Sequence, residues 1–290
     1  MSDFLEQVIA ERRIDVTRAK ARVPMEVLEL RARDLALTRR PGGYGIGDAR
    51  GGPGDTFTRA LRMLQGRLGV IAEVKRRSPA LGTLSADADP AALALAYEAA
   101  GATAVSVLTE PRHWGGSLED LVAVREAVRI PVLCKDVIVD EYQIVQARAA
   151  GADAVLLIAE ALTDEELHRF IARANTLGMG VLLEAHEPVA FGRAVAAGTM
   201  VVGVNARNLR RPTEIDVGRV RQLHTFARDG QVLVAESGIE SLDDARLLPA
   251  RVDAVLVGTA LMRSADPVPL IRGITASRKI PKATTIRVGR

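Results

Sequence analysis

Six charged or amide residues stand at or near the ends of short apolar runs, where their side chains could share one site. The first two, Glu73 and Lys75, lie two residues apart, so they take the same face of an extended strand. That face points inward if Ala72 and Val74 point outward. Four later runs end in the other members of the set: Lys135, Glu184, Asn205 and Glu236. Lysine and glutamate donate and accept protons, so the set suits acid–base chemistry.

The number of these residues favours a functional site over simple architecture. Any one of them could cap a strand and pair with a neighbour at a rim. Burying all six together costs hydration free energy that only a partner or a ligand can replace. We therefore interpret the whole set as a site.

Two short turns predict a phosphate-binding end for that site. Ser237-Gly238 follows the seventh apolar run and Gly258-Thr259 follows the eighth. In α/β barrels, these two positions commonly bind phosphate through backbone N–H groups and the start of a short helix. Two side chains from other loops are added as candidates: the hydroxyl of Ser78 and the guanidinium of Arg207.

The elements that must position these residues alternate in a regular way from residue 69 onward. Each short apolar run is followed by a turn and a longer helical segment, a pattern typical of parallel strands covered by helices. Eight such units predict closure into a (β/α)8 barrel. The runs are Val70–Lys75, Ala104–Leu108, Pro131–Lys135, Ala154–Ile158, Gly180–Glu184, Val201–Asn205, Val232–Glu236 and Ala254–Val257.

The pattern divides the chain into three parts. Residues 1–68 form an N-terminal extension, in which helical spacing over Asp3–Ala21 predicts an amphipathic helix and the Gly-rich segment Thr38–Gly54 predicts a loop. Residues 69–275 form the catalytic barrel. Residues 276–290 form a basic, flexible tail without an aromatic residue for base stacking, which argues against a nucleic-acid arm.

Composition agrees with one large α/β core. The chain has 290 residues, 48% of them apolar and 3% aromatic, so small and branched side chains must fill the core. No apolar stretch is long enough to span a bilayer, so no membrane partner is expected. The single cysteine, Cys134, cannot form an intrachain disulfide, and the N-terminus lacks a signal-peptide pattern. These observations favour a cytoplasmic enzyme.

The histidines give no sign of a metal site. His113, His168, His186 and His224 lack the spacing of metal ligands. We expect each of them at the surface or at the edge of a helix.

Several segments together resemble the barrel-mouth motifs of indole-3-glycerol phosphate synthases. They occur in the order found in that family: 71–79 (IAEVKRRSP), 106–110 (SVLTE), 115–117 (GGS), 131–136 (PVLCKD), 202–209 (VGVNARNL) and 235–239 (AESGI). The resemblance implies a carboxy-lyase of tryptophan or specialised indole biosynthesis. Its substrate would be 1-(2-carboxyphenylamino)-1-deoxyribulose 5-phosphate, and its products indole-3-glycerol phosphate, carbon dioxide and water. It implies no metal and no organic cofactor.

The same resemblance implies a role for each candidate residue. Lys135 is the acid that protonates the developing alkoxide during ring closure, and Glu184 is the base for dehydration. Lys75 is a second acid that also pairs with the substrate carboxylate. Glu73 and Glu236 hold lysines and substrate hydroxyls, and Asn205 orients the ribulose chain or a lysine. The substrate-binding set is Ser78, Arg207, Leu156, Val137 and Leu209, and the phosphate-binding set is Ser237, Gly238, Gly258 and Thr259.

The chain departs from the family pattern at three places. Val137 stands where an aromatic residue usually follows the strand-three lysine, which leaves space beside the aryl ring or admits a bulkier ring. Trp114 replaces a common Phe before Gly-Gly-Ser and could fill part of that space. Ala80-Leu81 replaces a more polar pair in the first loop, a change that would weaken closure over the phosphate.

Two other functions are compatible with a phosphate-binding barrel. One is a sugar-phosphate isomerase like phosphoribosyl-anthranilate isomerase, which would not need Lys75 and Lys135 together. The other is a non-catalytic barrel that binds a phosphorylated metabolite. The sequence leaves open a homodimer or an association with partner enzymes of the tryptophan pathway.

Overall fold

The computed structural model describes residues 3–38, 55–64 and 66–277. The predicted loop at 38–54, apart from Thr38, and the predicted tail, apart from its first two residues, lie outside these ranges. Within them, no helix combines the length and the apolar character that crossing a membrane requires.

Eight parallel strands close into a barrel, in the order β1-β10-β9-β8-β7-β6-β5-β4 and back to β1. This confirms the predicted (β/α)8 fold, and each predicted apolar run matches one strand to within one residue at either end. The strands are β1 (Gly69–Val74), β4 (Ala104–Leu108), β5 (Val132–Lys135), β6 (Ala154–Ile158), β7 (Gly180–Ala185), β8 (Val201–Asn205), β9 (Val232–Glu236) and β10 (Ala254–Val257).

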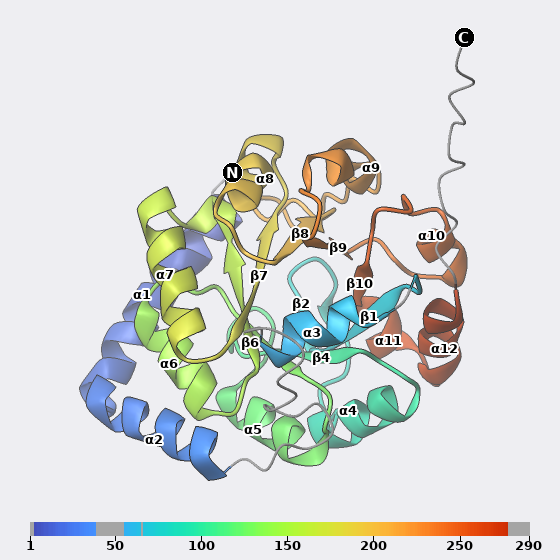
Figure 1. Cartoon of the computed structure of the whole chain (residues 1–290). Helices are drawn as coiled ribbons and strands as arrows, with labels where there is room; N and C mark the ends of the chain where they lie inside the picture. Colours follow the sequence, from blue (N-terminus) through green and yellow to red (C-terminus); the bar gives the residue numbers. More distant parts are fainter. Residues whose placement is uncertain (1–2, 39–54, 65, 278–290) are drawn as a thin grey trace.

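Helices surround the barrel (Figure 1). They are α4 (Pro90–Ala99), α5 (Leu118–Ala127), α6 (Glu141–Ala149), α7 (Asp164–Thr176), α8 (Pro188–Ala196), α9 (Arg219–Leu223), α10 (Leu242–Arg246), α11 (Thr259–Arg263) and α12 (Val268–Ala276), with 3-10 turns at Ala159–Ala161 and His224–Phe226. The first loop also carries a small antiparallel hairpin, β2 (Arg77–Ser78) and β3 (Gly82–Thr83), which the sequence analysis did not identify.

Strand alternation produces two apolar layers. In β1, Val70, Ala72 and Val74 belong to the layer between strands and helices. Ile71 points the other way, into the barrel interior. Glu73 has the same parity as Ile71, so the barrel directs its carboxylate inward, as predicted from the spacing.

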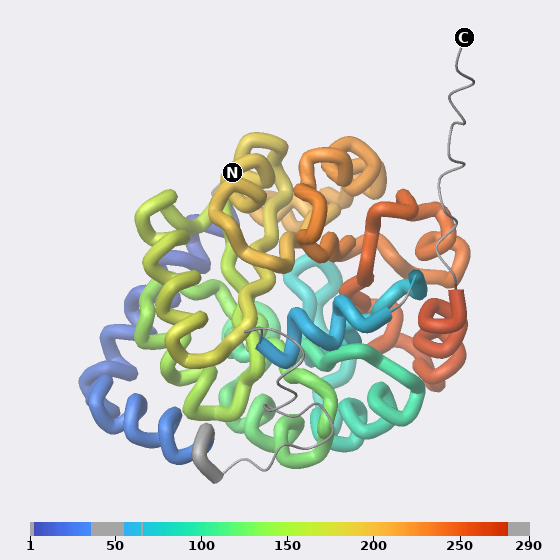
Figure 2. Tube along the Cα trace, viewed as in Figure 1, coloured from blue at the N-terminus to red at the C-terminus, as the bar shows by residue number. Residues whose placement is uncertain are grey.

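Three helices precede the barrel: α1 (Phe4–Arg22), α2 (Met25–Thr38) and α3 (Thr56–Arg62). The amphipathic spacing predicted α1, whereas α2 and α3 were not identified from the sequence. The tube view shows α1 and α2 beside α6 and α7 (Figure 2). Tyr142 of α6 fixes this contact, because its hydroxyl donates to the carbonyls of Ala19 (3.0 Å) and Val23 (2.7 Å).

Helix α3 lies across the barrel (Figure 1). Phe57 and Leu61 are buried in the interior apolar layer with Ile71 of β1 and Ala254 of β10. They cover strand starts that would otherwise meet water, so α3 seals the end of the barrel opposite the strand carboxyl ends.

We expect Phe57→Ala to lower the free energy of unfolding by about 3–5 kcal/mol, because it empties a fully buried site. Met63, at the end of the same helix, is 62% exposed and supplies the control. Met63→Ala should change the free energy by less than about 0.5 kcal/mol. Denaturant unfolding of both variants measures the difference, and equal values would show that α3 does not seal the barrel.

Candidate active site

The buried carboxylate of Glu73 holds both candidate lysines at the strand carboxyl ends. Its Oε1 lies 2.6 Å from Nζ of Lys75, and its Oε2 lies 3.2 Å from Nζ of Lys135. Lys135 is also 3.4 Å from Glu236 Oε2 and 4.0 Å from Glu184 Oε2. Four strands, β1, β5, β7 and β9, therefore deliver charges to one point.

These contacts shift the pKa values of the two lysines in opposite directions. Burial lowers the pKa of Lys75, and its one close carboxylate, Glu73, only partly offsets that effect. Burial would also lower the pKa of Lys135, but the charges of Glu73, Glu236 and Glu184 raise it well above its usual range. Burial would raise the pKa of Glu73, yet Lys135 and Lys75 together bring it down to about 2.

Glu184 is the carboxylate with the opposite behaviour. Burial and the nearby charge of Glu236 raise its pKa well above the usual value for glutamate, more than Lys135 lowers it. Asn205 donates from Nδ2 to its Oε1 at 3.4 Å. Glu184 therefore binds a proton more readily than Glu73 does.

Asn205 connects this charged centre with the next two loops. Its Oδ1 accepts from the backbone N–H of Arg207 (3.0 Å) and from the hydroxyl of Ser237 (2.8 Å). Its side chain thus spans the distance between Glu184 and the Ser237-Gly238 turn.

The two predicted phosphate turns have special backbone geometry. Ser237 and Gly238 have φ angles of 65° and 73°, and Ser237 is the non-glycine residue with positive φ in the described ranges. Gly258 lies so close to Glu73 that an added Cβ would stand 2.1 Å from the Glu73 carboxylate. Thr259 begins α11 directly after it. The second turn therefore lies against the lysine–glutamate centre.

One cavity of about 300 Å³ brings the candidates together. Every predicted site residue lines it except Glu236. That residue is fully buried, and its carboxylate contacts Lys135. The lining residues from the prediction are Glu73, Lys75, Ser78, Lys135, Val137, Leu156, Glu184, Asn205, Arg207, Leu209, Ser237, Gly238, Gly258 and Thr259.

An apolar wall on one side of the cavity includes residues that the sequence analysis missed. Val137 and Leu156 belong to the interior apolar cluster, and Trp114 packs against it. Phe4 of α1 contacts Trp114 edge-on at 6.0 Å between ring centroids. Leu5 and Val8 of α1 also line the cavity, as does Arg263 of α11. The spacing predicted the apolar face of α1 but not where that face packs.

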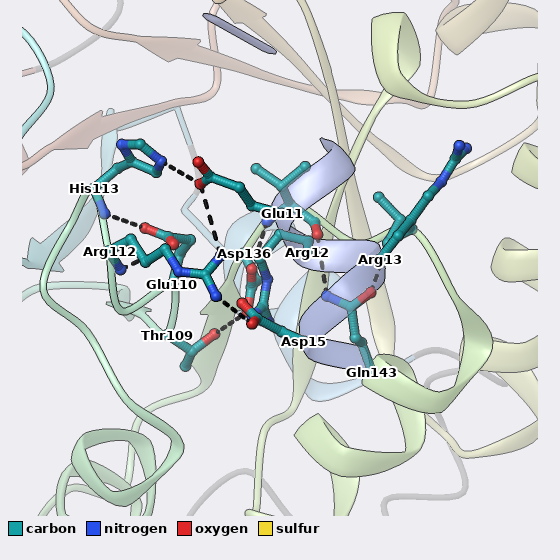
Figure 3. Close-up of polar contacts among 12 residues, drawn as sticks. Glu11, Arg12, Arg13, Asp15, Thr109, Glu110, Arg112, His113, Asp136 and Gln143 are labelled. Carbon is teal, nitrogen blue, oxygen red and sulfur yellow. Dashed lines mark hydrogen bonds and ion pairs between the residues drawn. The ribbon is translucent and has the colours of Figure 1, made fainter. Parts of the chain in front are cut away.

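Polar contacts hold α1 against the loops that follow β4 and β5 (Figure 3). Arg12 donates to Oδ2 of Asp136 at 2.7 Å, and Thr109 donates to the same oxygen at 2.8 Å. Nearby, Nε2 of His113 lies 2.7 Å from Oε2 of Glu11. Asp136 directly follows Lys135, so the anchor of α1 adjoins the charged centre.

The expectation that every histidine is superficial is wrong for His186. This residue is 4% exposed, and its Nδ1 lies 2.8 Å from the carbonyl oxygen of Asn205. Strand β7 ends one residue before it and carries it into the protein. His168 is exposed, and His113 and His224 are partly buried. The described residues contain no group of three or more His, Cys, Asp or Glu side chains arranged to hold a metal ion.

Comparison with known proteins agrees with the geometry. Low-identity solved structures share the fold: 3-hexulose-6-phosphate synthase from Salmonella typhimurium has a TM-score of 0.55 at 18% identity and covers 72% of this chain and 97% of its own. Thiamine phosphate pyrophosphorylase from Pyrococcus furiosus has a TM-score of 0.54 at 18% identity and covers 73% and 95%.

Relatives found by sequence have a much higher identity to this chain than these solved structures do. An indole-3-glycerol phosphate synthase from a Nocardioides species is 53% identical over 71% of this chain and 79% of its own length. Another, from Kineococcus radiotolerans, is 43% identical over 98% of both chains. The family model described as indole-3-glycerol phosphate synthase matches residues 5–274. On this evidence, the chain belongs to the indole-3-glycerol phosphate synthase family.

Proposed function

We propose that this chain converts 1-(2-carboxyphenylamino)-1-deoxyribulose 5-phosphate into indole-3-glycerol phosphate, carbon dioxide and water. The observation that carries the proposal is the pair Lys75 and Lys135, held by one buried carboxylate of Glu73 in a cavity with an apolar wall and two phosphate-type turns. The family match across residues 5–274 supports it over an isomerase or a binding barrel.

The lining of the cavity sets the orientation of the substrate. Its aryl ring packs on the apolar wall beside Val137, Leu156 and Leu209. Its phosphate meets the backbone N–H groups of the Ser237-Gly238 and Gly258-Thr259 turns, while Ser78 and Arg207 line the same cavity. The ribulose carbons then lie between these ends, over Lys135.

Lys135 is the acid for ring closure. The aryl carbon that bears the carboxylate attacks the ketose C2 carbonyl, and the oxygen becomes an alkoxide that needs a proton. Three surrounding glutamates raise the pKa of Lys135, so it carries that proton at neutral pH. The bond between the aryl carbon and the carboxylate then breaks. Carbon dioxide leaves, and the electron pair of that bond restores the aromatic ring.

Lys75 and Glu184 serve the later dehydration. Burial lowers the pKa of Lys75, which makes it the better donor to the departing C2 hydroxyl, and its charge also attracts the substrate carboxylate. Glu184 removes a proton in the same step. Its raised pKa makes it a stronger base than an ordinary glutamate once it is ionised. Glu236 acts through its charge, which raises the pKa of both Lys135 and Glu184.

We also propose that residues 1–68 work with the barrel, residues 69–275, as one catalytic unit, since Phe4, Leu5 and Val8 line its cavity. The cytoplasm is the proposed location, because a phosphorylated substrate is too costly to transfer through a bilayer unaided. Cell fractionation tests the location.

The proposed function is tested by turnover of the purified protein. Wild-type protein should form indole-3-glycerol phosphate, detected by its fluorescence. Lys135→Met should lower kcat at least tenfold while substrate affinity stays within about tenfold, because the variant loses the proton donor but keeps the cavity and the phosphate turns. A variant with more than a tenth of the normal kcat would remove Lys135 from this role.

The raised pKa of Glu184 predicts the acid limb of the pH profile. A base must be ionised, so activity is present above its pKa and is lost as the pH falls through it. Because that pKa is raised, kcat should fall at a higher pH than an ordinary glutamate would dictate. Glu184→Gln should be slow at all pH values, lack this limb and accumulate a decarboxylated intermediate. Normal turnover in Glu184→Gln would contradict the assignment.

Val137→Phe tests the aryl wall. If Val137 leaves apolar space, the larger ring should lower KM for the plain substrate, with a gain in binding free energy of at most about 1–3 kcal/mol. The same variant should disfavour a ring-methylated substrate, because packed walls tolerate added volume poorly. The measurement is kcat/KM for both substrates, and unchanged values for both would place the aryl ring elsewhere.

A further inference from the structure

His186 is a buried titratable residue that the mechanism above does not use. It follows β7 directly, two residues after Glu184, and the residue is 4% exposed. Its Nδ1 lies 2.8 Å from the backbone carbonyl oxygen of Asn205, at the end of β8. Because a carbonyl oxygen only accepts, Nδ1 must carry the hydrogen of this bond.

The backbone of His186 is held from the other side by Glu160. Oε1 of Glu160 accepts from the backbone N–H groups of His186 (2.7 Å) and Glu187 (2.9 Å). Glu160 lies just beyond the end of β6. After β7, the backbone at His186 and Glu187 is therefore held to the end of β6, and the imidazole of His186 is held to the end of β8.

The imidazole bond continues the ladder between β7 and β8. The last register pair of these strands is Ala185 with Val204, so His186 and Asn205 would be the next pair. At this next position of the ladder, the imidazole of His186 donates to the carbonyl oxygen of Asn205, in place of a backbone N–H. The bond fixes Asn205, whose side chain links Glu184 to the Ser237 turn.

We propose that His186 is a positioning residue, whose Nδ1–H holds the end of β8 so that Asn205 keeps Glu184 and the Ser237 turn in their reactive arrangement. The inference rests on the proposed function. His186 does not line the cavity, so it acts through Asn205 and not on the substrate.

Three substitutions separate this role from simple packing. His186→Asn keeps an N–H donor at the δ position. His186→Gln moves the donor to the ε position, and His186→Leu removes it while retaining an apolar volume. His168 supplies the matched control, since its Nδ1 also lies near a carbonyl oxygen, that of Asp164 at 2.6 Å, but on the exposed face of α7.

We expect His186→Leu and His186→Gln to lower kcat about 10- to 100-fold, because a shift near 1 Å in a reactive group has an effect of that size. KM should rise by a smaller factor than kcat falls, since the Ser237 turn moves with Asn205 but the apolar wall and the Gly258-Thr259 turn keep their places. His186→Asn should recover kcat to within about threefold of wild type, and His168→Leu should not change it.

Other outcomes overturn the proposal. The first is a wild-type kcat in His186→Leu. The second is an equal recovery of kcat in His186→Asn and His186→Gln. The third is a kcat in His186→Asn as low as that in His186→Leu. Thermal unfolding of each variant confirms that the folded protein is compared, because a purely structural role would shift the melting temperature and leave the kcat of the folded fraction unchanged.

NMR spectroscopy provides a readout that needs no turnover. Imidazole nitrogen signals, assigned to His186 by difference from His186→Asn, should show Nδ1 protonated and slow to exchange. The side-chain amide signals of Asn205 should shift in His186→Leu and stay in place in His168→Leu. If wild-type protein makes no product, the proposed function fails, and these signals still decide the positioning. An Nε2-protonated tautomer or unmoved Asn205 signals would refute it.

Discussion

The site depends on one buried carboxylate. Glu73 bonds to Lys75 with one oxygen and to Lys135 with the other, and both lysines are largely removed from water. Without this partner, two buried ammonium groups would repel each other across a low-dielectric interior. Only a closed barrel allows the arrangement, because β1 and β5 are separated by β4 and their inward side chains meet only inside the ring.

Unequal surroundings then give two identical side chains different chemistry. Lys75 has one close carboxylate and a lowered pKa, whereas Lys135 has three nearby carboxylates and a raised one. Glu73 and Glu184 diverge for the same reason: Glu73 touches both lysines, and Glu184 lies nearer to the charge of Glu236. In the proposed mechanism, burial and the distances to neighbouring charges thus make Lys135 an acid that retains its proton, Lys75 an acid that gives its proton up more readily, and Glu184 a strong base.

The sequence could predict what strand periodicity determines. Inward placement of Glu73, Lys75 and Glu184 follows from alternation, and the eight apolar runs predict the barrel. Elements stabilised by tertiary contact were missed: the two-residue strands of the β2–β3 hairpin have no period, and α3 is too short to show one. His186 did leave a signal. It stands two residues after Glu184, the same spacing that links Glu73 to Lys75, and the alternation that placed that pair inward also predicts burial for it.

The apolar wall could not be predicted because its parts meet only in the folded chain. Val137 is smaller than the usual aromatic residue, and the wall is completed by Trp114 from the loop after β4 and Phe4 from α1. Those two segments are fixed by Asp136, which accepts from Arg12 of α1 and from Thr109 after β4. Asp136 lies between Lys135 and Val137 and also accepts from the backbone N–H of Val137. Lys135 and the apolar wall therefore share one anchor. Under the proposed function, a change in how α1 docks must affect both the binding of the aryl ring and the position of the proton donor.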